Sequence, residues 1–207
     1  MTLRQEPVLR RVRSAPDWRA VRELRFRTLH AAGEIPPAAL RAFGDAFDAS
    51  ASTATYVLAA RDRVIGTTRG SLTAPRLRAA LPSQRVFLRE LHAAFGEDAV
   101  LVEASLTFLD GDARADPQDA LLRLFKVHAW RCAAENADAL VVAVRDTQIG
   151  FYRRRFDMEI LSGPERWPGM STPRVLMGLP WREHGANLLR RLPVLAASAE
   201  EENAFER

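Results

Sequence analysis

Cysteine, lysine and histidine are scarce in this 207-residue chain. The single cysteine, Cys132, excludes an internal disulfide and is typical of a reducing compartment. Lys126 is the one lysine among 30 basic residues, and this preference for arginine, together with abundant alanine, indicates a GC-rich bacterial genome. The four histidines show no metal-ligand spacing, so we predict no metal site.

Long apolar segments are also missing. No run approaches the roughly 20 residues that span a bilayer, so we predict no transmembrane segment. The first residues, Met1 to Arg4, lack the apolar core of a secretory signal, which makes the cytoplasm the expected location. With 47% hydrophobic residues, the chain can bury one sizeable core. We predict a single domain over residues 1–192 and an acidic tail over residues 193–207.

Positive charge is in excess, with a formal net charge of +4. Arginines cluster in segments 10–13, 22–27, 76–89, 153–155 and 182–191. These clusters are either solvated surface or a docking surface for an acidic partner, held by long-range attraction and bidentate contacts. No cluster alternates with aromatic residues as in nucleic-acid-binding modules, so we predict no nucleic-acid partner. An acidic carrier protein fits the pattern.

The most informative stretch runs from Leu101 to Asp157. Its expected elements are a strand over 100–108, an amphipathic helix over 117–135, a strand over 140–144 and a short aromatic helix over 151–157. A strand, a helix and a strand in this order form a crossover unit with parallel strands. Glu103 on the first strand and Tyr152 on the last helix are then candidates to converge on one cleft.

The flanking segments predict the other elements of an α/β domain. These elements are helices over 17–32, 38–47 and 85–95, a hairpin with strands 56–60 and 64–68, a Gly/Pro loop over 162–173, a strand over 174–179 and a helix over 181–192. Mixed helices and strands in this pattern predict a sheet covered by helices.

The order of first helix, hairpin and crossover unit resembles the GNAT acyltransferase superfamily. Within it, the chain is similar to the long-chain N-acyl amino acid synthases and their relatives, the acyl-homoserine lactone synthases. The segments that carry this resemblance, over about residues 17–180, are the arginine-rich Val21–Arg27, the hairpin Tyr56–Gly70, the Glu-x-Ser strand Leu101–Ser105, the aromatic motif Tyr152–Phe156, and the closing segments Trp167–Met170 and Pro173–Met177. The resemblance implies a GNAT-like mixed β-sheet flanked by α-helices on both faces.

The chain departs from ordinary acetyltransferases ahead of the crossover helix. Those enzymes carry glycines there, whose amides cradle the coenzyme A pyrophosphate. The corresponding stretch here, Asp112–Ala120, has no glycine pair. Asp116 is expected to cap the helix, with Pro117 as its first residue and Asp119 as a reciprocal capping acid. These carboxylates would repel a pyrophosphate, which argues against tight binding of free coenzyme A.

An acyl group on acyl carrier protein avoids this difficulty, because its phosphopantetheine arm has a single phosphate that side chains can hold. Arg114, Arg123 and Lys126 lie near the helix start and are candidates for this role, and the last two share a helix face. The alternative is that they are ordinary solvated charges. Lactone synthases usually continue Glu-x-Ser with arginine, whereas Leu106 stands here, which argues against S-adenosylmethionine as acceptor.

The resemblance implies amide formation, in which an amine attacks a thioester carbonyl. Glu103, flanked by apolar residues, would take the ammonium proton directly or through water, since a buried carboxylate is a better base than a solvated one. The alternative is a structural acid paired with Arg25 or Arg27.

Tyr152 matches the superfamily tyrosine near the sulfur and would donate a proton to the departing thiolate. The alternative is a core aromatic whose hydroxyl caps a loop. Backbone amides of Leu106, Thr107 and Phe108 would pair with pantetheine and polarise the carbonyl, at a point where the resemblance implies that two strands splay apart.

Arg69 and Arg145 end strands near the expected cleft and are candidates to hold the carboxylate of an amino-acid acceptor. We therefore expect an N-acyltransferase that moves a medium or long acyl chain from acyl carrier protein, or coenzyme A, to the amine of an amino acid. No permanently bound cofactor is expected, since acyl-phosphopantetheine is a co-substrate. Two alternatives stay open: a lactone synthase-like enzyme, and a degenerate, non-catalytic member that binds an acyl chain or carrier protein.

Overall fold

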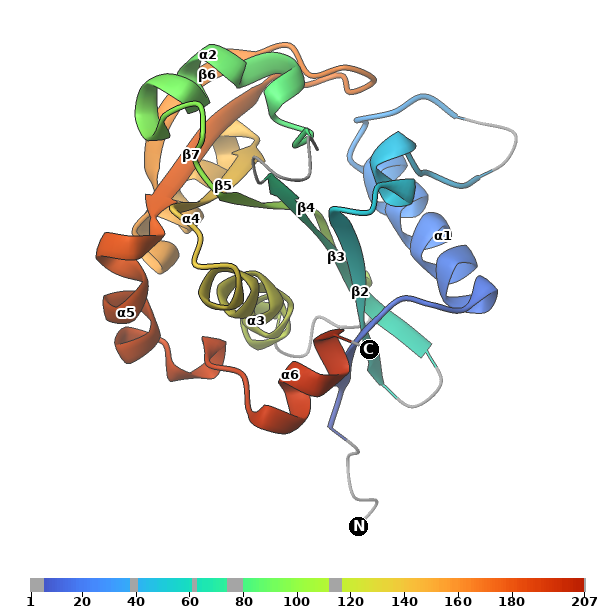
Figure 1. Cartoon of the computed structure of the whole chain (residues 1–207). Coiled ribbons are helices and arrows are strands. Elements are labelled where there is room, and N and C mark those ends of the chain that lie inside the picture. The colour runs from blue at the N-terminus through green and yellow to red at the C-terminus, as the bar shows by residue number, and fades with distance from the viewer. Residues whose placement is uncertain (1–5, 38–40, 61–62, 74–79, 112–116, 207) are drawn as a thin grey trace.

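A seven-stranded mixed sheet forms the centre of the computed structural model, which describes residues 6–37, 41–60, 63–73, 80–111 and 117–206 (Figure 1). Its strand order is β1-β2-β3-β4-β5-β7-β6. The strands are β1 (Val8–Arg11), β2 (Thr53–Ala60), β3 (Arg63–Thr73), β4 (Leu101–Leu109), β5 (Ala139–Val144), β6 (Glu159–Glu165) and β7 (Arg174–Pro180). Among these strands, β4 and β5 are the one parallel pair, as the crossover unit predicts.

Helices cover both faces of the sheet. They are α1 (Ala15–Ala31), α2 (Gln84–Phe95), α3 (Pro117–Ala134), α4 (Asp146–Phe156), α5 (Trp181–Arg191) and α6 (Ala199–Glu206). Figure 1 shows α1 and α3 on opposite sides of β2 and β3. Val102 and Ala104 of β4 pack with α3 and α4, whereas Leu101 packs with α2. Because successive side chains of a strand point to opposite faces, α1 and α2 cover one face and α3, α4 and α5 the other. The predicted α/β fold, a mixed sheet flanked by helices on both faces, is confirmed.

Local sequence signals explain where helices α1 and α3 begin. α1 begins after Ser14, whose Oγ accepts a hydrogen bond from the backbone N–H of Asp17 at 3.2 Å. α3 begins at Pro117, as expected, because proline is suited to a first helical position. Its buried face carries Phe125, which stacks on Phe156 of α4 with 4.2 Å between ring centroids. This aromatic contact ties the crossover helix to the element that carries Tyr152.

Strands β4 and β5 separate halfway along their length. Their pairing covers only Leu101–Ala104 against Ala139–Val142. Just beyond, Leu106 has a φ of +47° and the pairing of β3 with β4 shifts register. A leucine in the left-handed region next to a register shift marks a β-bulge, which bends the strand and re-aims its side chains. The splaying that the resemblance implies is therefore present.

Two of the predicted elements are wrong. The helix expected over 38–47 is absent from its described part, since residues 41–45 are non-helical and a short 3-10 helix, η1 (Ala46–Ala49), follows. Asp45 caps η1 instead of continuing a helix, because its carboxylate accepts the backbone N–H of Phe47 at 2.9 Å. The Gly/Pro loop expected over 162–173 begins inside strand β6, because an edge strand tolerates glycine and proline.

The sequence pattern also missed β1 and α6. β1 is short and largely charged, so it lacks an alternating apolar pattern. α6 lies in the segment expected to be a tail, and its Phe205 is buried against Tyr56 and Trp130. The domain boundary between residues 192 and 193 stays a prediction. In the part of the chain that the structure describes, no helix combines the length and apolar character needed to cross a membrane.

Candidate active site

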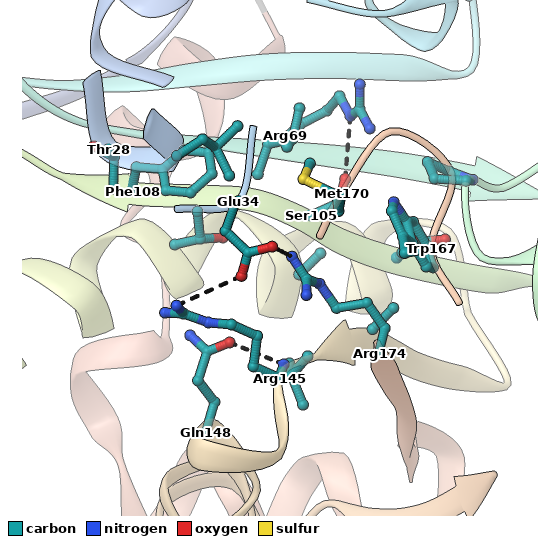
Figure 2. Close-up of a pocket in the computed structure, with 18 of the residues that line it drawn as sticks. Thr28, Glu34, Arg69, Ser105, Phe108, Arg145, Gln148, Trp167, Met170 and Arg174 are labelled. Carbon is teal, nitrogen blue, oxygen red and sulfur yellow. Dashed lines mark hydrogen bonds and ion pairs between the residues drawn. The ribbon is translucent and has the colours of Figure 1, made fainter. Parts of the chain in front are cut away.

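A cavity of about 350 Å³ opens where β4 and β5 separate (Figure 2). Its walls come from the second half of β4, the end of β5, the start of α4, the end of α1 and the loop that precedes β7. Both Glu103 and Tyr152 line it, as the sequence predicted for residues converging on one cleft. They approach from opposite faces of the sheet, because Glu103 lies on the α1 and α2 face whereas Tyr152 belongs to the core beneath α3.

Glu103 is fully buried and only half satisfied. Its Oε2 accepts hydrogen bonds from the backbone N–H of Ser83 at 2.9 Å and from the Ser83 hydroxyl at 2.6 Å. Its Oε1 has no hydrogen-bond partner among the described residues. Burial raises the pKa of Glu103 to about 7, and the two bonds from Ser83 act in the opposite direction. The expected alternative, a pair with Arg25 or Arg27, is not formed: those guanidinium groups bind Asp48 and Asp110.

Arg69 lies beside Glu103 but is already bound to carboxylates. Its Nη1 lies 2.5 Å from Asp45 and 3.3 Å from Asp48, and its Nε donates to Ser105 Oγ at 3.1 Å (Figure 2). Asp48 also accepts two hydrogen bonds from Nη1 of Arg25. Two arginines and two aspartates thus form a balanced, largely buried cluster. A role for Arg69 in binding an acceptor carboxylate stays a prediction, and such a carboxylate would compete with Asp45 and Asp48.

A second charged cluster, which we call the Glu34 cluster, consists of Glu34, Arg145 and Arg174. Glu34 follows α1, is 2% exposed, and lies 3.1 Å from Arg174 and 3.6 Å from Arg145 (Figure 2). Burial would raise the pKa of Glu34, but hydrogen bonds from Thr172 and Arg174 outweigh it and lower the pKa. One carboxylate therefore faces two guanidinium groups. The cluster has an excess positive charge at the cavity, and Arg145 is the more exposed of its two cations.

Glu34 and Arg174 were not singled out from the sequence. Arg174 lies in the closing segment that resembles the synthases, which is the one signal that pointed to it. No sequence signal pointed to Glu34, because it belongs to no motif. Its partner Arg174 lies 140 positions further along the chain.

Tyr152 lines the cavity from α4. Its ring packs against Phe125, with 5.7 Å between centroids, and against Phe151 at 5.4 Å. Among the described residues none forms a hydrogen bond with its hydroxyl, so the expected alternative of a loop cap is not seen. Burial raises the pKa of Tyr152 above its ordinary value, which keeps the phenol protonated at neutral pH.

Leu106, Thr107 and Phe108 all line the cavity at the bulge of β4, where the sequence placed the thioester. Phe108 and Thr28 of α1 both line the cavity (Figure 2). The Thr107 side chain lies on the other face of the sheet, because its Oγ1 is 2.7 Å from Thr68 Oγ1 and that hydroxyl contacts His128 of α3.

Two of the predicted phosphate-binding cations, Arg123 and Lys126, do not line the cavity. Arg123 donates to Asp119 at 2.7 Å, and Lys126 binds the carboxylate of Glu201 at 2.7 and 2.9 Å. Arg114 lies outside the described residues. The phosphate-binding role of these side chains stays a prediction. Within the described ranges no group of acids, histidines and cysteines is arranged to hold a metal ion.

Comparison with known proteins places these features in context. The family model described as N-acyl amino acid synthase FeeM matches residues 20–180. The solved structure of FeeM, an N-acyl amino acid synthase from uncultured soil microbes, is 19% identical with a TM-score of 0.76, covering 92% of this chain and 99% of FeeM.

Two acyl-homoserine lactone synthases are also similar in structure. BjaI, a CoA-dependent synthase, is 14% identical with a TM-score of 0.64, covering 93% of this chain and 91% of BjaI. LasI is 13% identical with a TM-score of 0.62, covering 83% of this chain and 87% of LasI. At these identities the structures show a shared fold. No curated protein sequence matches the chain significantly.

Proposed function

Because this chain belongs to the family of the N-acyl amino acid synthase FeeM, and is therefore an acyltransferase, we propose that it acylates an amino acid. The acyl group would be a medium or long fatty chain delivered on acyl carrier protein. One observation carries the proposal: the cavity between the separated strands holds an unpartnered oxygen of Glu103 on one face of the sheet and the protonated phenol of Tyr152 on the other.

The cavity wall suits a fatty chain. Apolar side chains contribute much of it, namely Leu29, Phe43, Phe47, Phe108, Leu121, Trp167 and Met170. Pockets for small molecules combine such walls with a few placed polar groups. Here the polar groups lie at the bulge, at the Glu34 cluster and around Arg69, whose guanidinium group lies over the ring of Phe47.

Glu103 would prepare the nucleophile. An α-ammonium group must lose a proton before its nitrogen can attack the thioester carbon, and a carboxylate with a pKa of about 7 is half ionised near neutral pH. The free Oε1 takes that proton directly or through one water and then releases it to solvent. The C–N bond forms as the carbonyl electron pair moves onto oxygen.

Tyr152 would serve the leaving group. When the tetrahedral intermediate collapses, the C–S bond breaks and its electron pair leaves with sulfur. The phenol donates a proton to that thiolate and regains one from the nitrogen as the amide forms, through groups at the cavity. The overall change is one ammonium and one thioester giving one amide, one thiol and one proton.

The Glu34 cluster would recognise the acceptor. An amino acid carries a carboxylate next to its amine, and Arg145 presents a partly exposed guanidinium group to the cavity. Glu34 holds Arg145 only loosely, at 3.6 Å, whereas Arg174 is bound more closely. Arg145 is therefore the cation that can turn to a substrate carboxylate, with the bidentate geometry that arginine offers.

Carrier protein is the donor that the first turn of α3 favours. Helix N-termini bind anions through free N–H groups and the helix dipole. In α3 the first turn contains Pro117, which has no N–H, and the carboxylate of Asp119. Both features weaken a site for the pyrophosphate of coenzyme A.

Mass spectrometry of lipid extracts tests the proposal. Bacteria that overexpress the chain are expected to accumulate an N-acyl amino acid, and cells with the Glu103→Gln or Tyr152→Phe variant are not. Homoserine lactones would instead assign the chain to the alternative enzyme, whose relatives BjaI and LasI share its fold. An unchanged lipid profile, together with acyl binding by the purified protein, would show a non-catalytic binder.

A further inference from the structure

A chain of three polar side chains runs from the core to the cavity. His128 of α3 and Thr68 of β3 are both 0% exposed, and His128 Nε2 lies 2.8 Å from Thr68 Oγ1. Thr68 Oγ1 in turn lies 2.7 Å from Thr107 Oγ1. Thr107 is the member that reaches the cavity, at the bulge of β4. These three residues, the His128–Thr68–Thr107 chain, take no part in the proton transfers proposed for Glu103 and Tyr152.

The hydrogen bonds of the His128–Thr68–Thr107 chain have a preferred donor and acceptor order. His128 Nδ1 has no hydrogen-bond partner among the described residues, and a Cβ on Gly70 would lie only 3.2 Å from it. A buried N–H without an acceptor is rarer and more costly than an unused lone pair. The proton of a neutral His128 therefore belongs on Nε2, where it is donated to Thr68.

The remaining steps follow from the single proton of each hydroxyl group. Thr68 accepts from His128 and donates its own proton to Thr107 Oγ1, because its hydroxyl has no other hydrogen-bond partner in the part of the chain that the structure describes. Thr107 then accepts from Thr68, so its own O–H is free to point into the cavity. Burial, helped by the charge of Arg131, lowers the pKa of His128 to about 3, so this arrangement persists at every physiological pH.

We infer that the Thr107 hydroxyl is a catalytic hydrogen-bond donor to the thioester carbonyl oxygen, oriented by Thr68 and His128 as positioning residues. The inference rests on the proposed function only in requiring an acyl thioester at the bulge. As the amine attacks, negative charge develops on that oxygen, and a donor already aimed at it stabilises the transition state more than the ground state. No proton leaves Thr107 in this role.

Substituting Thr107 by valine or by serine separates the effect of the hydroxyl group from the effect of side-chain shape. Thr107→Val keeps the branched side chain and removes the donor, so kcat is expected to fall about 100-fold, as for loss of one oxyanion donor, while KM changes less than about threefold. Thr107→Ser keeps the donor and is expected to stay within about fivefold of the wild-type kcat.

The same logic applies at His128. Glutamine places an amide nitrogen near the position of Nε2, so His128→Gln is expected to keep most of kcat, whereas the similarly sized His128→Leu is expected to lose about tenfold or more. Should the leucine variant fail to fold, Thr68→Val breaks the same chain one residue nearer to the cavity and is expected to lower kcat without a rise in KM.

The histidine tautomer gives a further readout, which is measured on the wild-type protein. In 15N NMR spectra of the wild-type protein, His128 is expected to show a protonated Nε2 and a bare Nδ1 that do not titrate between pH 5 and 8. Its signal is the one that disappears in His128→Gln. A protonated Nδ1 would reverse the chain and overturn the inference.

Kinetics distinguish this inference from the proposed function. An active wild type whose Thr107→Val variant has an unchanged kcat would overturn the inference alone. A wild type that releases no thiol from any acyl donor would overturn the proposed function and, because no thioester carbonyl is then attacked, the inference with it.

Discussion

Ser83 donates two hydrogen bonds to one oxygen of Glu103, from its backbone at 2.9 Å and from its hydroxyl at 2.6 Å, and leaves the other oxygen without a partner among the described residues. This asymmetry makes Glu103 different from a structural carboxylate. One oxygen fixes the side chain in place, and the other is available to take a proton. The first two predictions follow from this arrangement.

Activity is expected to rise with pH through a pKa of about 7, because only the ionised form of Glu103 accepts a proton. Ser83→Ala removes a bond that favours the ionised form, so it raises the pKa of Glu103 and moves this limb to higher pH, by about one unit or more for a bond to a charged group. The pH dependence of kcat/KM measures both. If the rise of kcat/KM occurs at the same pH in Ser83→Ala as in the wild type, a group other than Glu103 controls the pH dependence.

Stability is expected to depend on pH through the same carboxyl group. The folded chain holds a proton on Glu103 up to about pH 7, whereas the unfolded chain releases it near 4.5, so stability falls as the pH rises between these values. The total loss is about 3 kcal/mol by linkage. Glu103→Gln has no titrating group at this position and does not show this loss. Its stability relative to the wild type is therefore expected to be higher above pH 7 than at pH 4.5. Urea unfolding at pH 4.5 and pH 8 measures the difference, with Glu159→Gln at an exposed position as control.

Arg145 is expected to govern acceptor affinity. Arg145→Met removes the exposed guanidinium group of the Glu34 cluster, so KM for the amino acid is expected to rise about 10- to 100-fold with a smaller change in kcat, as for a lost charge-assisted hydrogen bond. Arg153→Met, at an exposed position of α4, the helix that follows Arg145, serves as the control. Equal KM values for the two variants would remove Arg145 from the acceptor site.

The donor preference is expected to favour carrier protein. In a competition between hexadecanoyl carrier protein and hexadecanoyl coenzyme A, the first should be consumed faster, because Pro117 and Asp119 occupy the first turn of α3. Asp119→Asn removes the negative charge and is expected to reduce the difference between the rates at which the two donors are consumed. If the wild type consumes both donors equally, the acidic first turn of α3 does not weaken the use of coenzyme A thioesters.

The sequence predicted the crossover unit well, and the reason is physical. The paired parts of strands β4 and β5 are buried on both faces, so they appear as apolar runs, and between them α3 begins at Pro117, a residue suited to a first helical position. The convergence of Glu103 and Tyr152 follows from that topology. By contrast, β6 lies at an edge of the sheet, where exposed side chains and a Gly-Pro pair give no strand pattern.

The charged contacts of the site could not be predicted from the sequence. Glu34 meets Arg174, and Asp48 meets Arg25 and Arg69, only because distant loops close over the cavity. Arg69 and Arg145 were both expected at strand ends, but Arg69 lies within β3 and is bound to two aspartates, whereas Arg145 follows β5 and is partly exposed. Charge partners depend on tertiary structure, and spacing along the chain does not encode them.

The most direct test of the account is a single turnover of purified protein with hexadecanoyl carrier protein and an amino-acid mixture, followed by mass spectrometry. The wild type is expected to form an N-hexadecanoyl amino acid, and Glu103→Gln is expected to bind the same donor with unchanged affinity but to form the amide at least about 100-fold more slowly. Amide formation by Glu103→Gln at the wild-type rate would contradict the account, because the fully buried carboxylate would then have no part in activating the amine.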